Sequence, residues 1–97
     1  MGQDPELRTS STVEMKWGHH RKGDQRREWA GCSDKITMSV LVRGKFRLRF
    51  RSPADGSKVI ERLLEREGDY AIWGTDAEHT WIVEEEAVIF TVRWKEK

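Results

Sequence analysis

The sequence predicts an all-β domain, folded as a sandwich or a barrel. Apolar and polar residues alternate with a period of two along most of the chain, which is typical of half-buried β-strands. Turn-forming residues recur about every 8–12 residues, and seven or eight short strands fit between them. The chain has 97 residues, five Trp and a net charge of +1, so one compact domain is expected and little self-repulsion opposes its folding.

The composition disfavours several classes of protein. No apolar run approaches the ~20 residues of a membrane-spanning helix, and no signal segment is recognised, so neither secretion nor a membrane partner is expected. Cys32 is the only cysteine, which rules out an internal disulfide and predicts a cytoplasmic location. Residues 1–11 are predicted to be a flexible tail or an expression remnant, and residues 12–97 the folded domain.

The first strand is expected at residues 13–17, where alternation continues up to Gly18. Residues 19–24 are polar and are predicted to form a solvated loop. The segment 26–29 is too short to assign. Residues 35–43 are predicted to form a central strand, because apolar side chains occupy both of its faces.

Gly44 permits a tight turn or a bulge before the next strand, at residues 45–51. Residues 52–57, which include Pro and an Asp-Gly pair, have the composition of a hairpin loop. Residues 58–66 fit either a helix or a strand with a bulge. The strand is preferred because the rest of the chain is rich in strands.

Three more strands complete the expected domain. They are predicted at residues 70–73, 79–83 and 87–94, with turns at 74–76 and 84–86.

The segment from Gly68 to Val83 resembles the second conserved motif of the cupins. That motif runs Gly, five residues, Pro, one residue, Gly, two residues, His, three residues, Asn. Gly68 and His79 keep their places, whereas Gly74, Asp76 and Val83 replace the Pro, the second Gly and the Asn.

Residues 35–50 resemble the first cupin motif, a strand, turn and strand with Gly44 as the turn glycine. Thr37 stands where the motif has its metal-ligand Glu, and no His is present among residues 30–33, where two are expected. The resemblance covers about residues 35–94. It implies a double-stranded β-helix, the jelly-roll barrel of the cupins, and an incomplete metal centre.

The resemblance also implies that His79 points into the barrel. Trp81 shares its face, Thr37, Ser39 and Leu41 share the inward face of another strand, and Trp73 and Trp94 lie on neighbouring strands. A cavity with these walls would hold a neutral or anionic small molecule, although the Trp residues are also explained as core packing. Burial is expected to lower the pKa of His79 below its usual 6.5. The predicted pocket residues are His79, Trp81, Thr37, Ser39, Trp73 and Glu28.

A metal site would need ligands in addition to His79, because one imidazole does not hold a functional metal ion. His19, His20 and Glu28 are the candidates, and two His with one carboxylate suit a facial triad. His19 and His20 would point to opposite faces if they lay in a strand. No cofactor is expected, and Cys32 has no activating His in its sequence neighbourhood.

Five basic residues occupy one face of a strand and form a basic stripe: Arg43, Lys45, Arg47, Arg49 and Arg51. Such a stripe suits a phosphate backbone, but aromatic residues for base stacking do not interleave with it. Residues 1–51 carry an excess of basic side chains and residues 52–97 an excess of acidic ones. Cross-strand pairing with Glu61, Glu65 or residues 84–86 is therefore the preferred explanation.

Three functions remain open. The leading hypothesis is a barrel that binds a small molecule without enzyme activity and without an intact metal centre. The second is a metal-dependent oxygenase or isomerase that uses His79 with rebuilt ligands. The third is an interaction or nucleic-acid-binding module acting through the basic stripe, with nucleic acid disfavoured. A homodimer is expected, buried through the outward row Met38, Val40 and Val42.

Overall fold

A computed structural model describes residues 13–31 and 34–95, and the predicted tail, residues 1–11, and Cys32 lie outside these ranges. The prediction of an all-β protein is confirmed, and every strand pairing is antiparallel. Within the described ranges no helix is long and apolar enough to cross a membrane. The six strands are β1 (Val13–His20), β2 (Gln25–Ala30), β3 (Lys35–Ser52), β4 (Asp55–Leu64), β5 (Tyr70–Trp73) and β6 (Glu78–Lys95).

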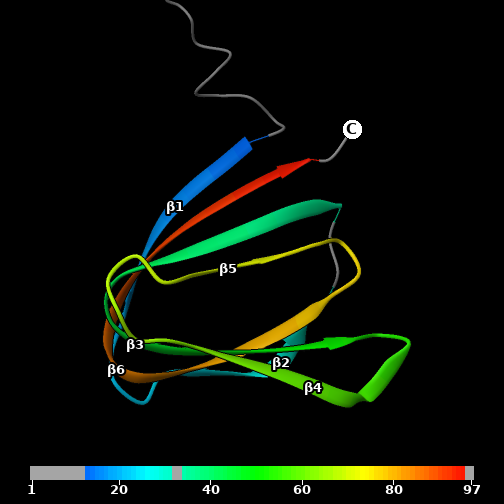
Figure 1. Cartoon of the computed structure of the whole chain (residues 1–97), viewed down its shortest axis with the longest axis horizontal. Helices are drawn as coiled ribbons and strands as arrows, with labels where there is room; N and C mark the ends of the chain where they lie inside the picture. The colour runs from blue at the N-terminus through cyan, green and yellow to red at the C-terminus, as the bar shows by residue number, and fades with distance from the viewer. Residues whose placement is uncertain (1–12, 32–33, 96–97) are drawn as a thin grey trace, which may run out of the picture.

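Two long strands, β3 and β6, organise the fold. Each has 18 residues, and they pair with each other from Lys35 opposite Lys95 to Arg51 opposite Glu78. Both strands bend near their middle, so each contributes to two sheets that face each other (Figure 1). One sheet, called here the first sheet, has the order β1-β6-β3-β5. The other, called the second sheet, contains β2, β6, β3 and β4.

The bend in β3 is a β-bulge at Gly44, one of the two alternatives that the sequence left open there. Gly44 has a φ of 99°, and the pairing with β6 shifts register between Leu41 and Phe46. A Cβ atom at Gly44 would overlap the carbonyl oxygen of Glu86 and lie 2.5 Å from the Cα atom of Ala87. The turn expected at residues 84–86 is wrong, because β6 continues through its bend without a chain reversal.

The structure also revises two predicted loops and decides the segment that the sequence left open between helix and strand. The loop predicted at residues 19–24 is shorter, because His19 and His20 extend β1 and pair with β6. The hairpin loop predicted at 52–57 shrinks to Pro53–Ala54, since Ser52 already pairs with Asp55. Residues 58–64 are strand, as preferred. Residues 59–64 pair with β3 in unbroken register, and an irregularity precedes them, because residues 56–58 stand between the partners of Ser52 and Arg51.

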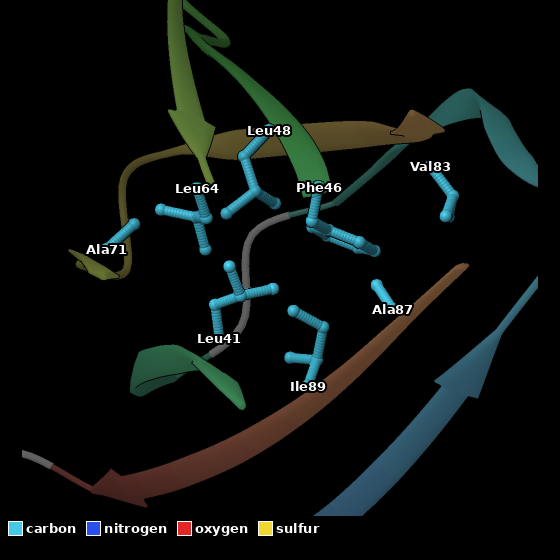
Figure 2. Packing of buried hydrophobic residues seen from close by; sticks show 8 residues of the cluster. All are labelled: Leu41, Phe46, Leu48, Leu64, Ala71, Val83, Ala87 and Ile89. Carbon is cyan, nitrogen blue, oxygen red and sulfur yellow. The ribbon is translucent and has the colours of Figure 1, made fainter. Parts of the chain in front are cut away.

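The apolar core lies between the two sheets near the bends. Figure 2 shows Leu41 and Ile89 of the first sheet facing Phe46, Leu48 and Leu64 of the second. Leu41, Leu48 and Val83 are the least exposed large side chains. The aromatic rings of Phe50, Trp73 and Trp81 pack against this cluster.

The predicted faces of β3 are confirmed. Thr37, Ser39 and Leu41 are buried between the sheets, and the alternate residues of the strand lie on the outer face. The strand is also central, as predicted, because it pairs with β4, β5 and β6.

Candidate ligand-binding cavity

The inner face of the first sheet is polar at the end remote from the bends. Directly paired residues of antiparallel strands share a face. Arg93 of β6 pairs with Thr37 of β3, which pairs in turn with Trp73 of β5. One row nearer the core, the hydroxyl oxygens of Ser39 and Thr91 lie 2.9 Å apart in a buried hydrogen bond. This sheet therefore presents an arginine, three hydroxyls and an indole to the interior.

Two adjoining cavities, of about 310 and 180 Å³, occupy this part of the interior. The larger one lies at the lower limit of the size range of small-molecule sites, and the two together lie within it. They share five lining residues drawn from four strands: Arg26, Thr37, Trp73, His79 and Arg93. The inner cavity extends further to Ser39, Trp81 and His20, among others. The structure thus brings together five of the six predicted pocket residues.

His79 lies at the centre of this arrangement. Its ring packs against Trp73, with 4.9 Å between the ring centroids, and Trp73 packs in turn against Phe50 at 5.0 Å. The Nδ1 atom of His79 is buried and has no hydrogen-bond partner in the described part of the chain. Desolvation lowers the pKa of His79 to about 4, and the charges of Arg26, Arg93 and Lys16 act in the same direction. This is the direction that the sequence predicts.

His20 occupies the inner end of the cavity. Its ring contacts Trp81 at 4.8 Å and Phe46 at 5.3 Å between centroids, and desolvation lowers its pKa. Gly18 makes room for it, because a Cβ atom there would lie 2.8 Å from the Nε2 atom of His20. His19 lies on the opposite face of β1 and is exposed. As expected for neighbours in a strand, only one of the two histidines points inward.

Two other predicted residues lie elsewhere. Glu28 is exposed on β2 and does not belong to the described residues that line either cavity. Trp94 pairs with Ile36 and Val13 on the outer face of the first sheet, so its expected place beside the cavity is wrong. Side chains alternate between the two faces of a strand. Trp94 alternates in step with the apolar residues on the outer face of β6, whereas Trp73 and Trp81 lie on inner faces.

The cavity-lining cations were not singled out from the sequence. Arg93 was recognisable, because it alternates with the apolar residues Val92 and Trp94 and must therefore face inward if they face outward. Arg26 gave no such indication, since the register of β2 against β6 shifts between Arg26 and Ala30. Alternation does not predict faces across such an irregularity.

The lining does not fit a divalent metal ion. Ala30, Gly31 and Thr37, at positions where the first cupin motif has ligands, do line the same cavity as His79. None of these three supplies a metal-binding imidazole or carboxylate. Among the described residues, no group of three or more His, Cys, Asp or Glu side chains comes together. Arginine side chains around His79 further oppose a cation.

From Lys45 to Arg51 the basic stripe lies on the outer face of the second sheet and is paired with carboxylates, as preferred, whereas Arg43 precedes the bulge and is exposed. The shortest pairs join Arg51 to Glu78 at 2.7 Å and Arg49 to Glu61 at 2.8 Å. Arg47 contacts both Glu61 and Glu84. Arg51 also lies over the ring of Trp29, 4.3 Å from its centroid, on the neighbouring part of the surface. This face is a network of ion pairs.

No protein-family model matches the sequence, and no curated protein matches it. Solved structures do match. The cupin domain of Drosophila melanogaster CENP-C aligns with a TM-score of 0.66 at 10% identity, covering 86% of this chain and 56% of that one. An RmlC-like cupin from Shewanella frigidimarina aligns with a TM-score of 0.68 at 14% identity, covering 89% and 68%. A structure of oxalate oxidase aligns with a TM-score of 0.71 at 14% identity, covering 87% and 42%.

These similarities show the fold, which is the cupin jelly roll, the double-stranded β-helix that the sequence resemblance implied. The chain spans about 60% of the CENP-C chain crystallised bound to CAL1 and 23% of Staphylococcus aureus CapF, which align with TM-scores of 0.71 and 0.73. The names of these proteins include an enzyme and a protein bound to a partner. The fold is therefore compatible with either kind of role.

Proposed function

We propose that this chain is a barrel that binds a small molecule in the cavity around His79 and performs no metal-dependent chemistry there. The observation that carries the proposal is the make-up of the lining. An aromatic wall from Trp73, a buried hydroxyl from Thr37 and unpartnered polar atoms on His79 and Arg93 surround an enclosed space. Ligand sites hold a small number of placed polar groups that fix the orientation of the ligand, and Thr37, His79 and Arg93 provide such groups beside the indole of Trp73.

The same lining argues against acid–base chemistry. A general base works best when its pKa lies near the operating pH, whereas the pKa of His79 is lowered to about 4. No Asp or Glu belongs to the described residues that line the two cavities, so a paired carboxylate is missing there. The alternative of a metal-dependent oxygenase or isomerase needs a carboxylate beside His79 and His20, and its candidate Glu28 is exposed on β2 and does not line either cavity in the described structure.

Metal analysis and ligand screening together test the proposal. Purified protein should contain far less than one metal ion per chain after exposure to Fe, Mn or Zn, with no difference between wild type and His79→Ala. Small molecules should shift the indole N–H resonances of Trp73 and Trp81 in NMR spectra. His19→Ala is the matched control, because His19 is exposed outside the cavity. A stoichiometric metal that is lost in His79→Ala and kept in His19→Ala would overturn the proposal in favour of the enzyme.

We also propose that two copies of the chain associate through the outer face of the first sheet. Three cross-strand rows on this face are apolar, and we call them the apolar face. They consist of Val13, Trp94 and Ile36; Met15, Val92, Met38 and Ile72; and Trp17, Phe90, Val40 and Tyr70. Trp17 and Tyr70 are more than 60% exposed. Contiguous apolar surface of this extent is typical of an interface.

A second copy is the occupant that the geometry favours. The apolar face spans four strands, which lie ~4.8 Å apart, and three rows along them. Its flat area is therefore on the order of 400 Å². The accessible surface is larger than this flat area, because side chains project from the sheet. Each partner of a standard interface buries about 800 Å² of accessible surface. A flat sheet face can meet its own copy about a twofold axis. Light scattering at several concentrations should give the mass of a dimer, and a monomer at all of them would overturn this proposal.

A further inference from the structure

We propose that the ligand of the cavity is an organic anion, whose carboxylate or phosphate group binds Arg93 and Arg26 and whose flat body lies against Trp73. This inference rests on the proposed ligand-binding function and adds the chemical class of the ligand. Three observations carry it: the sign of the charge in the cavity, the unpartnered polar atoms, and the order of groups along one row.

The charge in the cavity is positive. Four cationic side chains line the two spaces: Arg26, Arg93, Lys16 and Lys35. The carboxylate of Glu14 lies 2.6 Å from the Nζ atom of Lys35, and the charges of Arg93 and Lys16 also act on it. Glu14 does not line either cavity in the described structure, so one nearby carboxylate faces four cations and the balance is positive. The charges of Arg26, Arg93 and Lys16 accordingly act to lower the pKa of His79.

Two buried polar atoms in the cavity have no partner in the residues that the structure describes. They are the Nε atom of Arg93 and the Nδ1 atom of His79. Buried polar atoms of folded proteins are almost always hydrogen-bonded, so each such exception calls for a ligand or another explanation. Both atoms belong to side chains that line both cavities, and a guanidinium group is suited to hold a carboxylate or phosphate with two parallel hydrogen bonds.

The row of Arg93, Thr37 and Trp73 places these groups in a defined order. The three residues pair across β6, β3 and β5, so a guanidinium, a hydroxyl and an indole lie side by side on the inner face. A ligand with an anionic end, followed by a flat body, fits this order. Trp73 supplies the apolar wall, and Thr37, which is 4% exposed, supplies a buried hydroxyl for a polar substituent.

Matched aromatic probes test the inference directly. Benzoate and benzamide have the same ring and differ in charge, and phenyl phosphate and inorganic phosphate differ in the presence of the ring. Calorimetry on the full chain should show benzoate or phenyl phosphate binding at least about tenfold more tightly than benzamide. Inorganic phosphate should bind more weakly than phenyl phosphate. Comparison of benzoate with phenyl phosphate distinguishes the two sources of negative charge.

Two variants on cavity residues and one matched control locate the effect. Arg93→Gln and Arg26→Gln should each remove most of the preference for the anion, and either suffices if the other variant does not fold. Arg27→Gln is the control, because Arg26 and Arg27 are both exposed on β2 but, in the described structure, only Arg26 lines the cavity. It should leave the affinity for benzoate unchanged.

The possible failures are distinguishable by NMR. If benzamide binds as tightly as benzoate and both shift the indole resonance of Trp73, the cavity binds ligands without preference for anions, and only this inference is wrong. If Arg27→Gln weakens benzoate as much as Arg26→Gln does, the anion binds at the surface and the inference is also wrong. If none of the four probes shifts Trp73 or His79 at about 10 mM, the proposed function fails as well.

Discussion

The outer faces of the two sheets have opposite chemistry although the same two strands run through both. On the first sheet the outward residues of β3 include Ile36, Met38 and Val40, which belong to the apolar face. On the second sheet the outward residues are Arg47, Arg49 and Arg51, which are paired with carboxylates. A solvated surface and a surface suited to contact with another chain are thus built from one strand on either side of a single bulge.

The bulge at Gly44 makes this possible by changing parity. Before it, the inward residues of β3 have odd numbers, as in Thr37 and Leu41. After it they have even numbers, as in Phe46 and Leu48, and all four of these side chains are buried. Because side chains alternate strictly along a strand, the additional residue at the bulge is what keeps the apolar side chains inside in both sheets.

The largest expected effect comes from removing this bulge. Gly44→Ala forces a side chain into positive φ and onto the backbone of Glu86 and Ala87, and should destabilise the fold by more than about 3 kcal/mol. Urea unfolding measures the change in free energy. Gly56→Ala is the control, because its Cβ atom would meet only the side chain of Arg51 at 3.6 Å. Equal losses in the two variants would show that the bulge has no special role.

The next effect tests the contrast between the two outer faces. Ile72→Glu places a charge in the apolar face, and Val59→Glu places one opposite Arg51 on the second sheet. Both native side chains are about half exposed. Ile72→Glu should raise the dissociation constant of the dimer by at least about 100-fold, because the carboxylate would be desolvated. Sedimentation should show Val59→Glu as an unchanged dimer, and dissociation of both variants alike would contradict the contrast.

A third prediction concerns the interior between the faces. The pKa of His79 is about 4 in the folded chain against 6.5 ordinarily, so the unfolded chain binds the proton more readily. The contribution of neutral His79 to the free energy of unfolding is therefore complete above pH ~6.5, and it is lost as the pH falls toward 4. The loss should be on the order of 2 kcal/mol, reduced from the full pKa difference because the ring is partly exposed.

Unfolding measured at pH 7 and pH 4.5 checks this, with His79→Gln losing part of the pH dependence. His20, whose pKa is also lowered, contributes in the same direction and accounts for part of what remains. His19→Gln, on the exposed face of β1, should keep the wild-type profile. An NMR titration that places the pKa of His79 above 6.5 would contradict the prediction.

The smallest effect is expected on the charged face. Glu78→Gln removes one partner of the pair with Arg51 and should cost less than about 1 kcal/mol, since surface ion pairs contribute little. The difference from wild type should shrink further in 1 M salt, where the screening length is about 3 Å. The control is Glu65→Gln, whose carboxylate contacts no basic side chain in the described residues. A large, salt-independent loss for Glu78→Gln would show that this face is structurally essential.

Most of the fold was predictable because alternation of apolar and polar residues directly indicates half-buried strands. Residues 45–51 and 87–94 show it, and both are strand. Residues 84–86 were misread as a turn, and Gly44 was left open between a turn and a bulge, because composition does not distinguish a reversal from a bulge inside a continuous ladder. Propensity likewise left residues 58–66 open, and cross-strand pairing with β3 decides them.

The candidate site was predictable in part for the same reason. His79 and Trp81 share a parity on one strand, and Thr37 and Ser39 do so on another, so regular alternation groups them. Arg26 was missed because it precedes an irregular register between β2 and β6. Its place in the cavity depends on tertiary geometry that no local pattern reports.

The parity change at Gly44 also limits how the length of this chain can vary. One residue inserted or deleted between Lys45 and Arg51 would exchange the two sides of the strand. Arg47 and Arg49 would then point at the core, and Phe46 and Leu48 at solvent. The turn at Pro53–Ala54 lies beyond the last pair of the ladder, Ser52 with Asp55, and has no such restriction. Length changes among related sequences should therefore occur in pairs along β3 and singly only at that turn.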